Sequence, residues 1–182
     1  MKKKELRKIY KEKRTALTNK ERNQYSEKIL DSLKDLVNLK GKVVSVFAPI
    51  ERFAEINTYP LLVAKESTFV LPVMKGDDLI HVQFEELKQL EVNDWGIPEP
   101  TYGEDFDPQA IDIVIVPMLV FDLKGYRVGY GKGFYDQFLA QCRKDAQFIG
   151  LSIFDPIECI EDVHENDVQL HQIITPSKVY RF

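Results

Sequence analysis

The chain has 182 residues, of which 25 are basic and 29 acidic, so its net charge is −4, and 44% of its residues are hydrophobic. This composition argues against a disordered chain and against the general basicity of nucleic-acid-binding proteins. The longest apolar run, residues 113–121, is too short to cross a bilayer, and the two cysteines form no metal or redox motif. We therefore expect one cytoplasmic domain, residues 1–182, that binds neither nucleic acid nor membrane.

The first 14 residues carry eight basic and two acidic side chains, on a chain that is otherwise acidic. Apolar residues recur there at helical spacing (Leu6, Ile9, Tyr10 and Leu17), which predicts an amphipathic helix over residues 2–17. Its charges either face water or contribute to an anion-binding site, and the residues of this segment alone leave both interpretations open.

Helices and strands alternate along the rest of the chain. Thr18 and Glu21 form a T-x-x-E capping box that begins a second helix, whose apolar side extends to Val37. Further helices are predicted over residues 59–65 and 135–142, and strands over residues 42–48, 68–71, 80–84, 111–116 and 148–153. Strands that are continuously apolar and separated by helices predict a three-layer α/β/α fold with a mostly parallel mixed sheet.

Several single residues carry expectations of their own. His81 alternates with the apolar residues of its strand, so we expect it to face solvent. His164 and His171 belong to no metal-ligand pattern. We expect four further residues to pack in the interior, namely Tyr10, Phe121, Cys142 and Cys159.

The segment "GYRVGYGKGFYDQFL", residues 125–139, places four glycines directly before a predicted helix. Glycine lets backbone N–H groups approach a phosphate closely, and the helix N-terminus adds unpaired N–H groups and partial positive charge. Arg127 and Lys132 add full charges, although a tight connection in which glycine serves turn geometry alone is the alternative. Asp136 follows in the first helical turn, where the helix dipole favours it. Next to a phosphate it would instead require Mg²⁺ between them.

Residues 116–139, "VPMLVFDLKGYRVGYGKGFYDQFL", resemble the 5-formyltetrahydrofolate cyclo-ligase family, whose signature runs P-x-x-x-F-D-x-x-G-x-R-[LV]-G-x-G-x-G-Y-Y-D. The segments "KKELRKIYKEKR", "FAPIERFAEINTYPLL", "WGIPEP" and "HENDVQLHQIIT" look like the other conserved blocks of this family, in the same order. The resemblance therefore covers essentially the whole chain.

This resemblance implies ATP-dependent cyclisation of 5-formyltetrahydrofolate to 5,10-methenyltetrahydrofolate, with ADP and phosphate as products and Mg²⁺ as the metal. The formyl oxygen would attack the γ-phosphate to give a phosphorylated imidate, which N10 closes with loss of phosphate. Two other functions stay open: an ATP-dependent enzyme of the same fold with another acceptor, or a folate- or nucleic-acid-binding protein without turnover. The substrate would be a reduced folate, with or without additional glutamates, and the protein a monomer or weak homodimer.

The resemblance also implies a set of site residues. Lys132 would be the catalytic residue that neutralises the transferred phosphoryl group, and Asp136 and Asp167 would bind Mg²⁺. ATP would contact the basic pair Lys3 and Arg7, with Lys2 and Lys4 as close alternatives in register, and the loop residues Arg127, Val128, Gly129, Tyr130, Gly131, Lys132, Gly133, Phe134 and Tyr135. Folate would contact Ala48, Glu55 and loop residues 130–134, and Trp95 would either line the folate pocket or pack in the core.

Overall fold

The computed structural model describes residues 1–64, 66–76 and 78–182. Four helices are present in these ranges: α1 (Lys3–Thr15), α2 (Asn19–Leu36), α3 (Tyr59–Val63) and α4 (Phe134–Gln141). The strands are β1 (Val43–Ser45), β2 (Thr68–Lys75), β3 (Asp78–Gln83), β4 (Leu90–Val92), β5 (Pro98–Pro100), β6 (Ile113–Pro117), β7 (Val120–Phe121), β8 (Arg127–Val128), β9 (Gln147–Leu151), β10 (Gln172–Ile174) and β11 (Val179–Arg181). None of these helices is long and apolar enough to cross a membrane.

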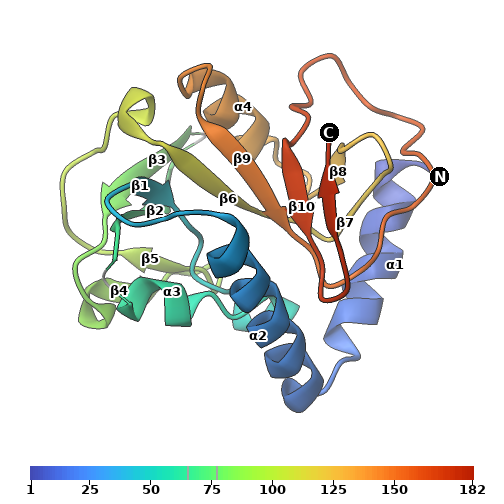
Figure 1. The fold of residues 1–182 in the computed structure, drawn as a ribbon, viewed down its shortest axis with the longest axis horizontal. Coiled ribbons are helices and arrows are strands. Elements are labelled where there is room, and N and C mark those ends of the chain that lie inside the picture. Colours follow the sequence, from blue (N-terminus) through green and yellow to red (C-terminus); the bar gives the residue numbers. More distant parts are fainter. Residues whose placement is uncertain (65, 77) are drawn as a thin grey trace.

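Seven strands form the central sheet, in the order β11-β10-β9-β6-β1-β2-β3 (Figure 1). Neighbours from β10 to β2 pair in parallel, and the two edge strands, β11 and β3, pair antiparallel. The predicted mostly parallel mixed sheet is confirmed. After β1 the chain adds β2 on one side and later returns to add β6 on the other side. In an open α/β sheet such a reversal leaves a crevice at the carboxyl ends of the two strands, here β1 and β6.

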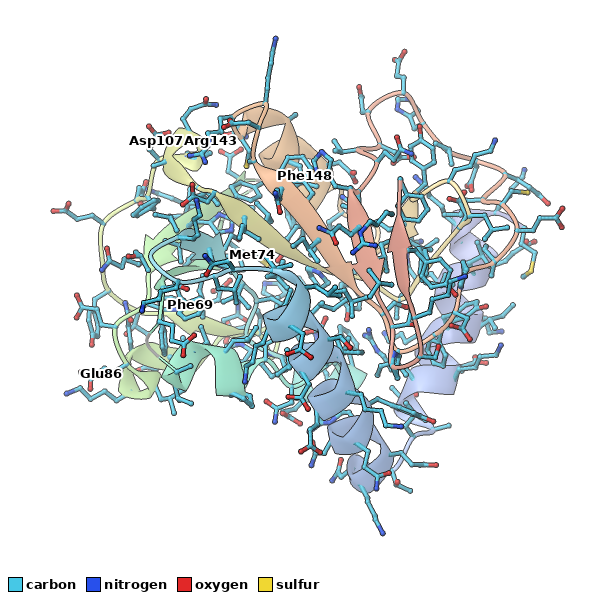
Figure 2. All side chains as sticks on the ribbon, viewed as in Figure 1. Phe69, Met74, Glu86, Asp107, Arg143 and Phe148 are labelled. Atoms are coloured by element: carbon cyan, nitrogen blue, oxygen red, sulfur yellow. The ribbon has the colours of Figure 1, made fainter. Side chains whose placement is uncertain are left out.

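The two faces of the sheet are covered by different helices, which confirms the three layers. Ile113 and Ile115 of β6 pack in one hydrophobic cluster with Ile29 and Leu33 of α2. The intervening residues of β6 pack in a second cluster, with Phe138 and Leu139 of α4. Figure 2 shows the side chains that fill the space between these layers, including Phe69 of the first cluster and Phe148 of the second. A strand buried on both faces explains why β6 reads as a continuous apolar run.

The helices follow their sequence signals closely. The predicted helix 2–17 is α1, and the capping box at α2 is confirmed: Thr18 Oγ1 accepts the N–H of Glu21 at 3.2 Å, and Glu21 accepts the N–H of Thr18 at 2.8 Å. The helix predicted for residues 59–65 is observed through Val63, and its expected last residue, Lys65, lies outside the described residues. The short pairs β4–β5 and β7–β8 and the strands β10 and β11 carry no strong periodic signal and were not predicted.

His81 does not face solvent as predicted, since its exposed fraction is 1%. Both faces of β3 are covered at this point, so alternation along the strand does not separate an inner from an outer face. The His81 ring stacks on Phe138 of α4 with 3.9 Å between centroids, and its Nε2 is 2.9 Å from Ser45 Oγ. Burial lowers the pKa of His81 to about 3, so the ring is neutral at physiological pH.

Of the other predictions for single residues, most are confirmed and one, for Cys159, is wrong. Phe121 is fully buried and Tyr10 packs, partly exposed, against a small cluster that contains Leu6. Cys142 is buried as predicted, but Cys159 is exposed, because it lies in the loop between β9 and β10 rather than on an element that faces the core.

Candidate active site

A cavity of about 460 Å³ lies at the carboxyl ends of β1 and β6, where the strand order reverses. Phe47 and Ala48, which follow β1, and Pro117, the last residue of β6, line its base. Every site residue expected from the sequence lines this cavity except Val128 and the two alternatives in register, Lys2 and Lys4. Val128 is fully buried in β8 and packs with Leu6 instead, so its side chain cannot contact a ligand there.

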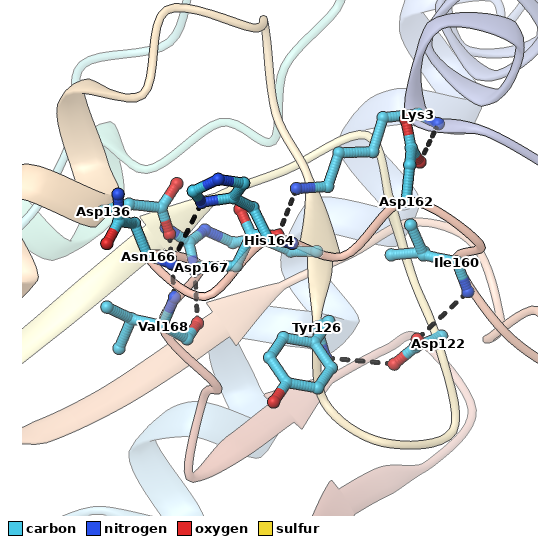
Figure 3. A network of polar contacts seen from close by, with 11 residues as sticks. Lys3, Asp122, Tyr126, Asp136, Ile160, Asp162, His164, Asn166, Asp167 and Val168 are labelled. Atoms are coloured by element: carbon cyan, nitrogen blue, oxygen red, sulfur yellow. Dashed lines mark hydrogen bonds and ion pairs between the residues drawn. The ribbon is translucent and has the colours of Figure 1, made fainter.

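The loop that begins with β8 is fixed by a turn built on Asp122. This carboxylate is 1% exposed, and its Oδ1 accepts the backbone N–H groups of Lys124 and Tyr126, each at 3.0 Å. Its Oδ2 accepts the N–H of Ile160 at 3.1 Å (Figure 3). The aspartate thus satisfies donors that a tight hairpin leaves unpaired. The hairpin then directs the glycine loop, residues 129–133, over the cavity and into α4.

Two glycines in this loop are required by geometry. Gly131 has φ +96°, and a Cβ there would lie 2.8 Å from Cζ of Arg7. Gly133 has φ +74° and is the residue that precedes α4. The Arg7 side chain reaches from α1 and donates from Nε to the carbonyl of Gly129 at 3.0 Å. The loop therefore packs directly against a cation of the N-terminal helix, with no space for a side chain between them.

Two acid–base pairs connect this region to the segment after β9 (Figure 3). Lys3 Nζ pairs with Asp167, and Arg127 Nη2 donates to Asp136 Oδ1 at 2.7 Å. The same oxygen of Asp136 accepts the N–H of Val168 at 3.0 Å, and Oδ2 of Asp167 accepts the N–H of His164 at 2.6 Å. The fold thus brings Asp136 and Asp167, 31 positions apart in the chain, to the same end of the cavity.

These two carboxylates fit a Mg²⁺ ion that shares phosphate oxygens. Each keeps a second oxygen, Oδ2 of Asp136 and Oδ1 of Asp167, to which no described residue donates a hydrogen bond. Among the described residues no group of three or more His, Cys, Asp or Glu is placed to hold a metal alone. Mg²⁺ in proteins is commonly bound by one or two carboxylates, with water and substrate phosphates completing its coordination. The donor set therefore fits the ion only together with a phosphorylated ligand.

Lys132 is exposed at the tip of the glycine loop and lines the cavity. No carboxylate of the described ranges is within ion-pair distance of its ammonium group. Its charge is thus available for a ligand, which distinguishes it from Lys3 and Arg127.

A buried carboxylate, Glu55, lies on the other side of the cavity. It is 2% exposed, its Oε2 accepts the N–H of Ile50 at 2.7 Å, and its Oε1 accepts the hydroxyl of Tyr130. Ala54 before it has φ +49°, the left-handed conformation, which turns the chain at this point. Burial raises the pKa of Glu55, and the positive charge of Arg14 opposes that rise.

Apart from Arg52 and Glu99, the rest of this side is apolar, and it comes largely from segments that the sequence did not connect with a site. Phe53 stacks on Tyr130 with 4.9 Å between ring centroids. The remaining apolar lining residues belong to β2, β3 and the β4–β5 pair: Pro72, Met74, Leu79, Ile97 and Pro98. Trp95 lines the cavity and is 62% exposed, so it does not pack in the core. These residues carry no local signal, because each resembles an ordinary core position.

Comparison with known proteins agrees with this geometry. The profile of the 5-formyltetrahydrofolate cyclo-ligase family matches residues 1–176. The 5-formyltetrahydrofolate cyclo-ligase of Mycoplasma pneumoniae is 29% identical over 180 residues, which cover 96% of this chain and 98% of that protein. A probable 5-formyltetrahydrofolate cyclo-ligase of Schizosaccharomyces pombe is 31% identical over 113 residues, 54% of this chain and about half (55%) of that protein.

A solved structure extends the agreement to the whole fold. The NMR structure of Aquifex aeolicus 5,10-methenyltetrahydrofolate synthetase superposes with a TM-score of 0.83 at 33% identity, and the match covers 100% of this chain and 93% of that one. The match includes the N-terminal helix as well as the glycine loop. The chain therefore belongs to the 5-formyltetrahydrofolate cyclo-ligase family.

Proposed function

We propose that this protein catalyses the ATP- and Mg²⁺-dependent cyclisation of 5-formyltetrahydrofolate to 5,10-methenyltetrahydrofolate, with release of ADP and phosphate. The observation that carries the proposal is the composition of one cavity. One side has the glycine loop, four cations and two carboxylates, and the other has a mainly apolar surface around a buried glutamate, with Arg52 and Glu99 also lining it. A charged phosphate group and a flat heterocycle would each find the surface chemistry it requires.

The glycine-loop side would bind ATP. Backbone N–H groups of residues 129–133 and the start of α4 suit phosphate oxygens, and Lys3, Arg7 and Arg127 add positive charge. Lys132 would neutralise charge on the transferred phosphoryl group, because no described carboxylate pairs with it. Val128 would support this side from β8 without touching the nucleotide. Asp136 and Asp167 would hold Mg²⁺, which would neutralise and orient the phosphates.

The other side would bind the pterin of the folate. A buried carboxylate accepts hydrogen bonds from ring N–H and amino groups, and Glu55 is held with both oxygens inside the cavity wall. Ala48 lies at the base of the cavity and Trp95 at its exposed margin, where each would contact the flat ring system. Residues 130–134 separate the two sides and would contact both ligands.

This arrangement would place the formyl group against the γ-phosphate. The formyl oxygen attacks phosphorus and ADP leaves, so a poor amide electrophile becomes a phosphorylated imidate. N10 then attacks the formyl carbon, the N10 proton is lost, and phosphate departs with the former formyl oxygen. The chain need only hold the reactants in line and balance the developing charge, so no side-chain nucleophile is required.

The proposal also covers the cellular compartment, the form of the folate and the oligomeric state. The two cysteines, Cys142 and Cys159, are free thiols, which suits a reducing cytoplasm. We propose that the enzyme works there on a reduced folate, with or without additional glutamates, as a monomer or weak homodimer.

The test is absorbance at the methenyltetrahydrofolate band, with purified protein, 5-formyltetrahydrofolate and Mg²⁺, with and without ATP. The proposal predicts a rise in absorbance that requires ATP and disappears when a chelator removes the metal. A protein that binds both ligands and yields no product would contradict it.

A further inference from the structure

Arg14 is a buried cation for which the proposed reaction gives no role. It lies in the last turn of α1, and its exposed fraction is 3%. Its Nε donates to the carbonyl of Phe53 at 2.7 Å, its Nη1 donates to the carbonyl of Met118 at 2.9 Å, and its Nη2 donates to the hydroxyl of Tyr130. One guanidinium thus joins the N-terminal helix to three other segments around the cavity.

The contact with Tyr130 continues to Glu55. The hydroxyl that accepts from Arg14 donates in turn to Glu55 Oε1. The Tyr130 ring is held by Phe53, with 24° between the ring planes. Arg14 also fixes the backbone of Phe53, so it restrains Tyr130 through both the hydroxyl and the stacked ring. The Glu55 side chain is therefore positioned by a chain of hydrogen bonds that begins on α1.

The charge of Arg14 fits this role. The titratable groups that face Glu55 are Arg14 from α1, Tyr130 from the glycine loop, Tyr135 from α4 and Glu51 from the turn before Glu55. Arg14 is the sole cation in that set. Burial raises the pKa of Glu55, and Arg14 is the largest influence in the opposite direction. An ionised carboxylate accepts hydrogen bonds from a heterocycle more strongly than a protonated one, so a cation that favours ionised Glu55 favours this binding.

We propose that Arg14 is a positioning residue that acts through the Tyr130 hydroxyl to hold Glu55 in the orientation that folate binding requires. Because Arg14 is on the same helix as Lys3 and Arg7, this connection links the seating of α1 against the glycine loop to the folate side of the cavity. The inference rests on the proposed function, and it assigns to α1 a task beyond phosphate contact.

The test compares four single variants of the full chain and one double variant. Arg14→Met removes the charge and the donors, Arg14→Lys keeps the charge without the fork of donors, and Tyr130→Phe keeps the stacked ring and removes the hydroxyl. Lys13→Met is the matched control, because Lys13 is exposed on the same helix and does not line the cavity. For each we would measure KM for 5-formyltetrahydrofolate and for ATP, the pH profile of kcat/KM, and the pH dependence of folate binding by calorimetry.

We expect Arg14→Met and Tyr130→Phe to raise the folate KM about ten-fold or more, while the ATP KM changes by less than about three-fold. In Arg14→Met the acid limb of the folate profile should move to higher pH, because Glu55 without its cation is protonated more easily. Arg14→Lys should restore the acid limb and part of the affinity. The double variant of Arg14→Met and Tyr130→Phe should be no weaker than the worse single variant, since both break one connection.

The inference is overturned if the folate KM stays unchanged in Tyr130→Phe and Arg14→Lys, or if the KM values for folate and ATP rise in equal proportion. If Arg14→Met does not fold, these two variants decide. If the wild-type protein forms no product, the proposed function is rejected instead. The pH dependence of folate binding by calorimetry would still decide whether Arg14 governs folate binding. If the wild-type protein is active and the variants have the same KM values and pH profile, this inference alone is rejected.

Discussion

The two sides of the cavity are built in different ways. The glycine-loop side comes largely from one continuous stretch, β8 to α4, which a single aspartate turn holds in place. The opposite side is assembled from a turn after β1, two neighbouring strands and the separate β4–β5 pair. One side is rich in charged side chains and accessible backbone N–H groups, and the other is mainly apolar around one buried carboxylate.

This difference separates two requirements of the proposed reaction. Phosphate is recognised by backbone N–H groups and charges, whose spacing a short motif can fix. A flat heterocycle is recognised by shape and apolar contact, which distant segments supply as well as near ones. Changes on the two sides should therefore affect the KM for ATP and the KM for folate separately, except where a change displaces the backbone of residues 130–134.

The largest expected effect is at Lys132. Lys132→Ala should lower kcat by about 10²–10³-fold, because it removes charge stabilisation that acts on the transferred phosphoryl group. Steady-state kinetics with saturating folate and ATP measures this. Lys124→Ala is the matched control, an exposed lysine of the same segment that does not line the cavity, and it should retain near-normal kcat. Equal activity of the two variants would contradict the role of Lys132.

Gly131 tests how closely α1 and the loop must approach. Gly131→Ala places a Cβ 2.8 Å from Cζ of Arg7 at φ +96°, a conformation that costs about 1–2 kcal/mol for a residue with a side chain. We expect an ATP KM about ten-fold higher. Gly129→Ala is the comparison, because Gly129 has an ordinary φ and a Cβ added there would meet no atom within 4 Å, so its effect should be clearly smaller. A larger effect at Gly129 would contradict this packing of α1 on the loop.

Trp95 tests the apolar side. Trp95→Ala should raise the folate KM about five-fold through lost ring contact, with the ATP KM within about two-fold. The free energy of unfolding should change by less than about 0.5 kcal/mol, because the side chain is 62% exposed. Tyr102→Ala, at an exposed aromatic residue that does not line the cavity, is the control. A loss of stability without a change in folate KM would reject the assignment.

His81 is buried and does not line the cavity, so a change there should alter stability and leave both KM values intact. Its folded pKa, about 3, is below the ordinary 6.5, so the unfolded chain binds a proton first as the pH falls. The contribution of the neutral His81 ring to the free energy of unfolding is complete above pH 6.5. It decreases below that pH, by about 2 kcal/mol at pH 5.

Denaturant titrations at pH 7 and pH 5 measure this contribution. In His81→Gln, which does not titrate, the decrease in the free energy of unfolding over this interval should be smaller by about 2 kcal/mol. Equal decreases in both proteins would mean that His81 is solvated in the folded state.

The sequence predicted the layers, the parallel sheet and the glycine loop because each has a local pattern: apolar runs, a capping box and closely spaced glycines. Through the family signature it also predicted the glycine-loop residues that line the cavity, Arg127 and residues 129–136. On the apolar side the sequence predicted Ala48, Glu55 and Trp95. Met74, Leu79 and Ile97 were missed, since they look like core residues until the fold exposes them to a cavity. Arg14 was missed because eight basic residues in 14 look like a solvated face, and burial of one of them depends on contacts with residues 39, 104 and 116 positions away.

The central claim is that one cavity brings the formyl oxygen to the γ-phosphate. The most direct measurement uses 5-formyltetrahydrofolate labelled in the formyl group with a heavy oxygen isotope, followed by mass spectrometry of the released phosphate. We expect the label to be transferred to phosphate in step with methenyl product. Product formation with unlabelled phosphate would contradict it, because the formyl oxygen would then have left by another route.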